Sequence, residues 1–226
     1  MADDIHYGRI PAQGKTKGKI GVLVESHYDE TEFRAFNEYF PKNGYSVDYI
    51  SHLWGKEYLD FVGNDGTSCV RVDVEVSDIR TEDYCGIVLI GGYAMDRLRY
   101  EANPKQGQLN QAPAVQFLRA AVEALNRGQV KIGTICHSLW LFCADPQLLA
   151  GRKVTCAHNV ISDVQNAGAE VVFEGDQTQE LVIDGNLITG KHPEVVETFV
   201  RVFLEEIEKA VNRNPLPEEC HQEKSQ

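Results

Sequence analysis

Three short apolar runs lie between stretches with helical periodicity, and they constrain the fold of this chain most strongly. The runs are KIGVLVE at 19–25, GIVLIGG at 86–92 and KIGTI at 131–135. A strand buried on both faces, as in a parallel sheet, has this near-continuous apolar pattern. Helical patterns occur at 30–42, 113–127 and 196–207. The alternation predicts a mostly parallel sheet covered by helices on both faces.

Shorter patterns complete the predicted α/β order. YSVDYIS at 45–51 alternates as a strand, and SCVRVDVEV at 68–76 alternates more clearly, which favours a half-exposed side ribbon. The remaining expected elements are a strand at 151–157, a short helix at 159–167, a strand at 169–174, and two strands within 180–190 joined by an Asp-Gly turn.

Length and composition indicate one domain over residues 1–226, with a core at about 19–208 between a polar leader (1–18) and a polar tail (213–226). The net charge of −12 argues against nucleic acid or an anionic membrane as the main partner. No apolar run has the length of a membrane span, and the first residues lack a signal-peptide core. We therefore expect a cytoplasmic protein.

The six cysteines show no CxxC spacing, which predicts reduced thiols and no metal site. GGYAMD at 91–96 is not a nucleotide-binding GxGxxG fingerprint, so no cofactor is expected.

The segment KIGTICHSLWLFCA at 131–144 has the layout of a nucleophile elbow. A buried strand ends at Cys136-His137, and an apolar run at helical spacing follows. Such a turn predicts a strained backbone at Cys136. A helix N-terminus beside the cysteine would favour the thiolate and lower the thiol pKa. The alternative is a cysteine that only packs in the core.

The fold brings this elbow close to other polar segments. In parallel α/β sheets the active site lies at the carboxyl ends of the strands. The loop ESHYDETE at 25–32, GGYAMD at 91–96 and Cys136-His137 all follow such ends. The segment after 189 is a fourth candidate. We expect these segments to form one site.

Four segments resemble the ThiJ/PfpI superfamily, which includes DJ proteins, PfpI-type intracellular peptidases and glyoxalase-III-like enzymes. The segments are VLVESHYDETE, IGGYAMDRLR, ICHSLWLFCADPQLLAGRKVT, and NVISDVQNAGAEVV with LVIDGNLITGKHPEVVETF. The resemblance covers roughly residues 19–208 and implies a flavodoxin-like three-layer α/β/α sandwich with a nucleophile elbow.

The resemblance also assigns roles to residues. Cys136 matches the family nucleophile, and Glu32 matches an acid whose protonated side chain hydrogen-bonds the sulfur. His137 matches the histidine that follows the nucleophile. Asp96 matches an acid that reaches this histidine from a neighbouring subunit, which implies a homo-oligomer, a dimer or higher. The simpler alternatives are an exposed capping acid for Glu32, a wall residue for His137 and a helix N-cap for Asp96.

Backbone N–H groups of Gly92 and Ser138 are the expected oxyanion donors. His27, His158 and His192 are possible pocket residues, although a solvated loop histidine is the simpler interpretation of each. The chain departs from the family pattern at 93–95, at 138–139 and at 191–192, and it has an insertion at 101–111. These departures leave the substrate open.

The expected function is a cysteine-dependent enzyme that acts on a small-molecule substrate. Glyoxalase- or deglycase-like action on reactive carbonyls and hydrolysis of amide or peptide bonds are both compatible with a cysteine nucleophile. The alternative is a redox-sensing stress protein with chaperone-like binding, in which Cys136 is oxidised. A glutamine amidotransferase ranks third. Such an enzyme normally has a His-x-Glu pair late in the chain, and His192 and Glu194 have this spacing only because they lie in the family's closing segment.

Overall fold

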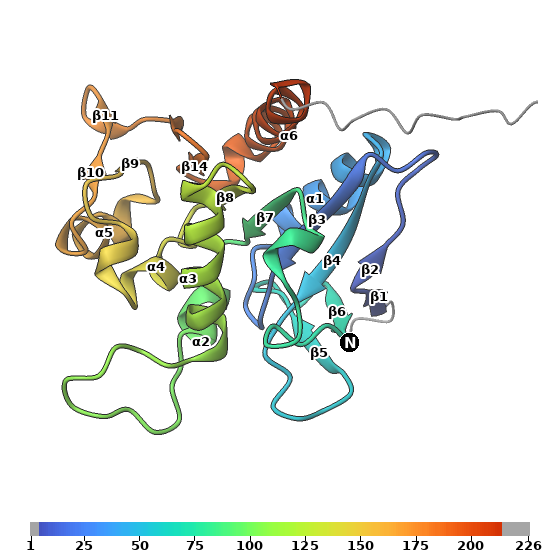
Figure 1. The fold of residues 1–226 in the computed structure, drawn as a ribbon, viewed down its shortest axis with the longest axis horizontal. Helices are drawn as coiled ribbons and strands as arrows, with labels where there is room; N and C mark the ends of the chain where they lie inside the picture. The colour runs from blue at the N-terminus through green and yellow to red at the C-terminus, as the bar shows by residue number, and fades with distance from the viewer. Residues whose placement is uncertain (1–4, 214–226) are drawn as a thin grey trace, which may run out of the picture.

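The computed structural model describes residues 5–213 and centres on a seven-stranded, mostly parallel sheet (Figure 1). The strand order is β13-β14-β8-β7-β3-β4-β2. The five inner strands are parallel, and the edge strands β13 and β2 are antiparallel. The strand bounds are β2 Arg9–Ile10, β3 Gly18–Leu23, β4 Tyr45–Ile50, β7 Gly86–Leu89, β8 Lys131–Ile135, β13 Leu181–Asp184 and β14 Leu187–Gly190.

Helices cover both faces of this sheet and make a three-layer α/β/α sandwich, which confirms the predicted fold class. Helices α1 and α6 pack together on one face, while α2, α3 and α4 pack together on the other. A short helix, α5, lies next to α4. The bounds are α1 Glu30–Lys42, α2 Ala94–Leu98, α3 Pro113–Asn126, α4 Trp140–Cys143, α5 Ile161–Asn166 and α6 Val196–Arg213.

The residues predicted to form a side ribbon lie outside the main sheet, as expected. β6 (Cys69–Val72) is the middle strand of a three-stranded sheet, between β1 (Ile5–Tyr7) and β5 (Leu59–Val62). The described part of the polar leader thus pairs with both sheets, through β1 and β2. Residues 1–4 and 214–226, which include nearly all of the expected tail, lie outside the described residues.

The region after the elbow is more broken than the sequence pattern suggested. The strand expected at 151–157 is reduced to β9 (Lys153–Val154), which pairs with β10 (Glu170–Val171) outside the main sheet. β11 (Phe173–Glu174) and β12 (Gln177–Thr178) form a separate hairpin. Four 3₁₀ segments complete the described chain: η1 Thr81–Asp83, η2 Pro146–Leu148, η3 His158–Val160 and η4 Pro193–Val195.

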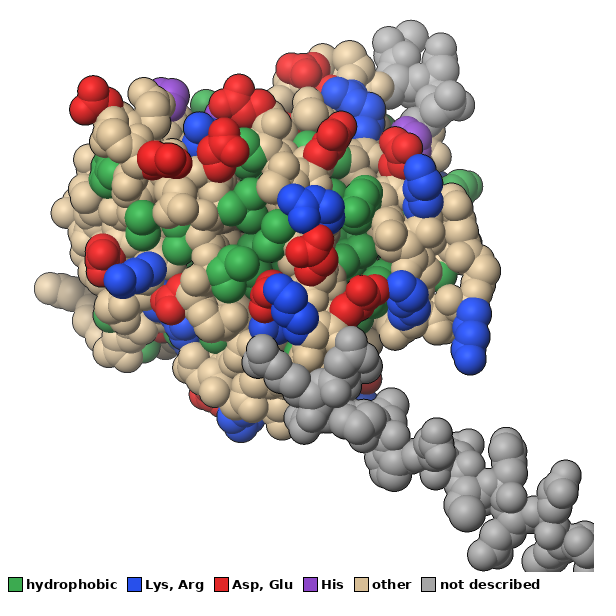
Figure 2. Space-filling model, turned by 90° about the horizontal axis from the view of Figure 1, so that it is seen from above, with side chains coloured by type: hydrophobic (Ala, Val, Ile, Leu, Met, Phe, Trp, Pro, Cys, Tyr) green, Lys and Arg blue, Asp and Glu red, His purple; other side chains and the backbone are tan. Residues whose placement is uncertain are grey.

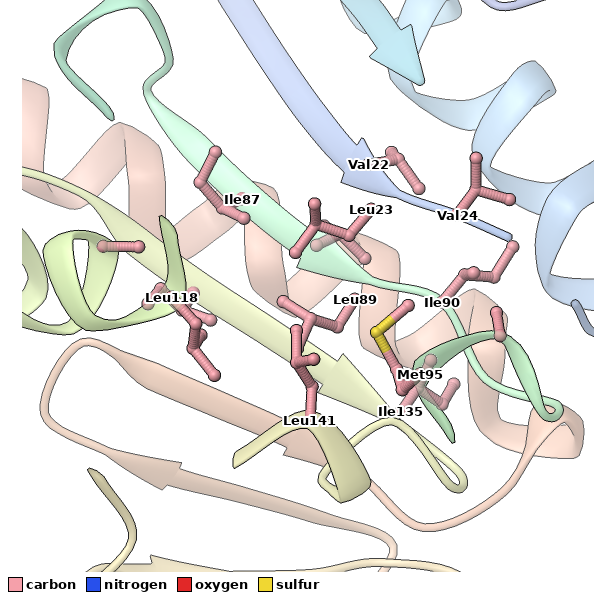
Figure 3. Close-up of a cluster of buried hydrophobic side chains, with 14 of the residues drawn as sticks. Val22, Leu23, Val24, Ile87, Leu89, Ile90, Met95, Leu118, Ile135 and Leu141 are labelled. Carbon is pink, nitrogen blue, oxygen red and sulfur yellow. The ribbon is translucent and has the colours of Figure 1, made fainter. Parts of the chain in front are cut away.

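Side chains from the sheet and both helical layers make one core. In Figure 3, Leu23, Leu89 and Ile135 from three neighbouring strands lie together with Leu118 of α3 and Leu141 of α4. On the opposite face, two glycines make room for the phenylalanines of α6. An added Cβ on Gly133 would lie 2.8 Å from Phe199, and one on Gly86 would lie 2.7 Å from Phe203. This close contact fixes α6 against the strand that carries Cys136.

The surface mixes charges of both signs. Figure 2 shows acidic and basic side chains around a set of hydrophobic ones on one face of the molecule. None of the helices within residues 5–213 is long and apolar enough to cross a membrane.

Candidate active site

Cys136 occupies a strained turn directly after β8. Its φ of 61° lies in the left-handed region, which costs a non-glycine residue about 1–3 kcal/mol. The surrounding backbone holds the turn in place. The Cys136 N–H donates to the Gly190 carbonyl at 2.9 Å, and the Cys136 carbonyl accepts from Ala157 N at 3.1 Å. The predicted backbone strain is confirmed.

Ser138 closes this turn through hydrogen bonds with Ile135. Its Oγ accepts a hydrogen bond from Ile135 N at 2.7 Å, and its own N–H donates to the Ile135 carbonyl at 3.1 Å. The expected role of Ser138 as an oxyanion donor is therefore wrong, because the turn uses both groups. The N–H groups that act on the Cys136 sulfur are those of Gly92 and His137.

Glu32 is completely buried at the start of α1. Asp29 is the N-cap of this helix and accepts from the Glu32 N–H at 3.0 Å, so Glu32 is not an exposed capping acid. Glu32 Oε2 accepts from Gly91 N at 2.6 Å. Burial raises the pKa of Glu32 well above its ordinary value, and the charge of Asp29 raises it further. The surroundings of Glu32 therefore favour the neutral carboxylic acid over the carboxylate.

The second carboxyl oxygen of Glu32 is unsatisfied. Within residues 5–213, Glu32 Oε1 is buried without a hydrogen-bond partner. The expected hydrogen bond from this oxygen to the Cys136 sulfur is thus not present. A buried acid with one bonded oxygen and one free oxygen has a proton to donate.

Gly91 brings the acid and the nucleophile together. An added Cβ on Gly91 would lie 2.6 Å from Glu32 Oε1 and 2.8 Å from Cys136 Cβ. Both distances are shorter than side-chain contacts allow. The backbone after β7 therefore approaches Glu32 and Cys136 closely only because residue 91 has no side chain.

We expect Gly91→Ala to destabilise the fold by about 1–3 kcal/mol through overpacking and to change the rate at which iodoacetamide alkylates Cys136, because Glu32 and Cys136 are displaced. Gly8→Ala is the matched control. Its added Cβ would lie 2.8 Å from the Arg71 carbonyl, on the side sheet. Urea unfolding should show two destabilised proteins, and the alkylation rate of Cys136 should change only in Gly91→Ala. Equal alkylation rates in both variants would contradict this placement of Gly91.

The Cys136 thiol has a raised pKa, opposite to the expected direction. Burial is the main cause and the nearby Glu32 carboxylate is the second, while the N–H groups of Gly92 and His137 act in the lowering direction. The side chain is only 7% exposed. The helix that follows, α4, has four residues and begins only at Trp140. Its dipole is too short and too distant to offset the loss of water around the sulfur.

His137 is fixed by Asn159 and by two aromatic rings. Its Nε2 lies 2.8 Å from Asn159 Oδ1, and its ring centroid lies 5.0 Å from that of Trp140 and 5.6 Å from that of Tyr93. Burial lowers the pKa of His137, so the imidazole is neutral at neutral pH. Its Nδ1 is buried and has no partner among the described residues.

Asp96 pairs with its own helix neighbour. Its Oδ1 accepts from Arg99 Nη2 at 2.6 Å and from Arg99 Nε at 3.0 Å. The N-cap of α2 is Tyr93, so the N-cap alternative for Asp96 is wrong. Within the described chain, the side chain hydrogen-bonded to His137 is that of Asn159 and not that of Asp96. A role for Asp96 across a subunit interface stays a prediction.

The three histidines predicted as pocket residues, His27, His158 and His192, separate into two groups. When protonated, His192 and His158 lower the pKa of His137, which places both near its ring. Both side chains are exposed. His27 is exposed as well, and it acts on Glu25 instead. The elbow therefore has two histidines close to its mouth.

An open cavity lies next to Asp96 and Glu25. It has a volume of about 430 Å³ and is lined by Trp54, Tyr100 and Asp96 among others, and Cys136 and Glu32 do not line it. In the part of the chain that the structure describes, no group of three His, Cys, Asp or Glu side chains is placed to hold a metal ion.

Sequence reasoning missed Asn159, Tyr93 and Trp140. Trp140 lies in the apolar run of the elbow and has a polar signal only in its indole N–H, which donates to Asp163 at 3.1 Å. Asn159 directly follows His158, one of the candidate pocket residues. Because Asn159 is the neighbour of a candidate pocket residue, it could have been considered as a pocket residue as well.

Comparisons with known proteins agree with this architecture. An uncharacterised protein of Staphylococcus haemolyticus is 28% identical over 190 residues, which is 84% of this chain and 98% of that protein. The fold is similar to Drosophila melanogaster DJ-1β, with a TM-score of 0.64 and 17% identity over 87% of this chain and 96% of that one.

A two-domain protein of Anabaena variabilis, with DJ-1/ThiJ/PfpI-like and ferritin-like domains, gives a TM-score of 0.71 at 24% identity. The match covers 91% of this chain and 52% of that one. The model of the DJ-1/PfpI family matches residues 18–206. The chain belongs to the DJ-1/PfpI family.

Proposed function

We propose that this protein is a cysteine-dependent enzyme that converts small reactive carbonyl compounds, with 2-oxoaldehydes as the substrate class. The observation that carries the proposal is the pairing of a strained Cys136 with a buried acid. Glu32 keeps one carboxyl oxygen without a partner among residues 5–213, and both groups approach the same glycine, Gly91.

The residues present can perform each step of such a conversion. The Cys136 sulfur adds to the aldehyde carbon, the thiol proton goes through His137 to the carbonyl oxygen, and a hemithioacetal forms. Glu32 donates its proton to the ketone oxygen and, as the carboxylate, takes the hydrogen from the hemithioacetal carbon, which gives an enediol. It then delivers this proton to the second carbon and takes one back from the hydroxyl on the sulfur-bearing carbon, which leaves a thioester and a neutral Glu32. Water cleaves the thioester to a 2-hydroxy acid and restores the thiol. The sum is addition of one water to the 2-oxoaldehyde.

The burial of the site favours a small substrate over a peptide. Cys136 is 7% exposed, and Glu32 is fully buried. A peptide bond in a folded or extended chain needs an open groove over the nucleophile, whereas a three-carbon aldehyde needs only a narrow entrance. A deglycase reaction on small adducts would use the same groups, and peptide hydrolysis is the least favoured of the three activities.

The same surroundings support a second candidate, a redox sensor. Gly92 and His137 direct N–H groups at the sulfur, and the neutral Glu32 adds an O–H donor. These donors fit the oxygens of a cysteine sulfinate. Mass spectrometry after treatment with hydrogen peroxide distinguishes the two. A sensor forms the sulfinate at Cys136 at low peroxide and shows no turnover.

The test of the enzyme proposal is a substrate panel. Wild-type protein is assayed with methylglyoxal, with a glycated amino acid, with an amide and with a peptide. We expect turnover of methylglyoxal and little or none of the peptide. If the protein hydrolysed the peptide and did not consume methylglyoxal, the proposal would be wrong.

Glu32→Gln is expected to move two properties of this site in opposite directions. In the alkaline range in which the Cys136 thiol ionises, an ionised Glu32 raises the pKa of Cys136, and the variant lacks this charge. Alkylation of Cys136 by iodoacetamide should therefore reach its half-maximal rate at a lower pH. The amide does not shuttle a proton, so turnover should fall by about a hundredfold. An unchanged alkylation profile would show that Glu32 and Cys136 do not interact.

A further inference from the structure

The imidazole of His137 has a polar partner in its own chain that the family resemblance did not assign. Asn159 Oδ1 lies 2.8 Å from His137 Nε2, and Asn159 comes from η3, on the loop that follows β9. An amide oxygen only accepts hydrogen bonds, so Nε2 carries the hydrogen. The other ring nitrogen, Nδ1, is then the basic one. It is buried and has no hydrogen-bond partner within residues 5–213, although the nearby Gly92 backbone acts on the His137 pKa in the raising direction.

The ring has little freedom to leave this position. Tyr93 and Trp140 contact it from two sides, and the Trp140 indole N–H is itself bonded to Asp163. The Arg99 guanidinium lies over the outer face of Trp140, 5.7 Å from the ring centroid, and binds Asp96. The acid expected to orient His137 is thereby engaged elsewhere in the same protomer.

We propose that Asn159 is a positioning residue that fixes the orientation and the tautomer of His137 from within one chain, in place of an acid from a neighbouring subunit. The proposal depends on the proposed function at one point only, which is that His137 acts as a base in the reaction. The Asn159 amide oxygen acts on the pKa of His137 in the raising direction, but burial outweighs it. A carboxylate in its place would stabilise the imidazolium more strongly. The base therefore stays neutral and ready to accept a proton.

Other charged and titratable groups also surround the ring, and a test of Asn159 has to separate their effects. Cys136 precedes the ring in the chain, and Glu32 lies beyond Cys136. The groups from the packed elements are Tyr93 before α2, His158 in η3, His192 before η4, and Asp163 and Arg99 on either side of Trp140. Substitutions at Asn159 leave all of these in place, so a change in His137 reports the amide alone.

The test uses the full chain with ¹⁵N-labelled histidine. The His137 signals are assigned with His137→Gln, and the tautomer and pKa are followed by long-range ¹H–¹⁵N spectra. We expect wild-type His137 to carry its hydrogen on Nε2. Asn159→Asp should raise the pKa of His137 by about 1 unit or more, because an opposite charge stabilises the imidazolium. Asn159→Leu should leave a mixture of tautomers.

The matched control is Asn166→Asp, which adds the same charge at the far end of α5 and should leave the His137 pKa unchanged. Both Asn159 and Asn166 are exposed, so the variants should fold, and thermal midpoints check this. In turnover of methylglyoxal, Asn159→Leu should lower kcat about tenfold with KM unchanged, since the residue acts through the base (scale of).

Two results would overturn the proposal. One is a tautomer and pKa of His137 that stay the same in Asn159→Asp and Asn159→Leu. The other is a His137 pKa that shifts in Asp96→Asn, measured at concentrations that keep the protein oligomeric, and does not shift in the Asn159 variants. The spectra need no substrate, so the expected tautomer without methylglyoxal turnover would reject the proposed function and leave the role of Asn159 standing.

Discussion

Cys136→Ser is expected to lower the rate of methylglyoxal conversion by about three orders of magnitude or more, which is the scale of losing a nucleophile. A serine hydroxyl fills nearly the same space, so the elbow should keep its shape. The hydroxyl, however, has a far higher pKa than a thiol and adds poorly to a carbonyl at neutral pH. Loss of the dicarbonyl and formation of the 2-hydroxy acid are the two measurements.

Cys143→Ser provides the comparison for this prediction. Cys143 is the last residue of α4 and is partly buried, and burial raises its thiol pKa to about 11. It should contribute packing alone, so its variant should retain the wild-type rate. If Cys136→Ser remained active while Cys143→Ser did not, the nucleophile would have been assigned to the wrong cysteine.

Much of the fold was predictable because its main elements have strong local periodicity. The pattern at 30–42 coincides with α1, and the pattern at 113–127 exceeds α3 by one residue. The elements that were missed, β1, β2, β5 and β12, have two to four residues each. Strands of this length exist because of their partners, such as Asp48 and Val47 for β2, and a partner far away in the chain leaves no local pattern.

The site was predictable in its residues and less so in its chemistry. The position of Cys136 followed from the end of a buried strand, and burial of Glu32 followed from the family resemblance. The direction in which the Cys136 pKa is shifted could not be predicted from the sequence, because it depends on the length of α4 and on the loss of solvent around the sulfur. The contact of His137 with Asn159 joins residues 22 positions apart, across two irregular segments that no periodicity predicts.

The first turn of α1 holds two buried glutamates with opposite titration behaviour. Burial raises the pKa of Glu32 well above its ordinary value of 4.5. Burial acts in the same direction on Glu30, but Thr67 and Ser68 outweigh it. Glu30 accepts two hydrogen bonds from each of them, at 2.6–3.1 Å, and its pKa is lowered as a result.

These opposite shifts give opposite dependences of stability on pH. The folded protein keeps the proton on Glu32 after the unfolded chain has lost it, so this contribution is complete below about pH 4.5 and is lost as pH rises towards the folded pKa. Glu30 stays ionised in the folded protein, so its contribution is present above its unfolded pKa and is lost as pH falls through the folded pKa.

Glu32→Gln and Glu30→Gln should therefore diverge when the free energy of unfolding is measured in urea from pH 4 to pH 8. Relative to wild type, Glu32→Gln should gain about 1.4 kcal/mol for each pH unit above the unfolded pKa, until the folded pKa of Glu32 is reached. Glu30→Gln should be less stable than wild type at pH 7, and the deficit should shrink below about pH 4.5. Each variant serves as the control for the other, because the two residues share one helical turn and one substitution. Parallel curves would mean that Glu32 is ionised in the folded protein, which would contradict the neutral carboxylic acid from which the proposed proton transfers start.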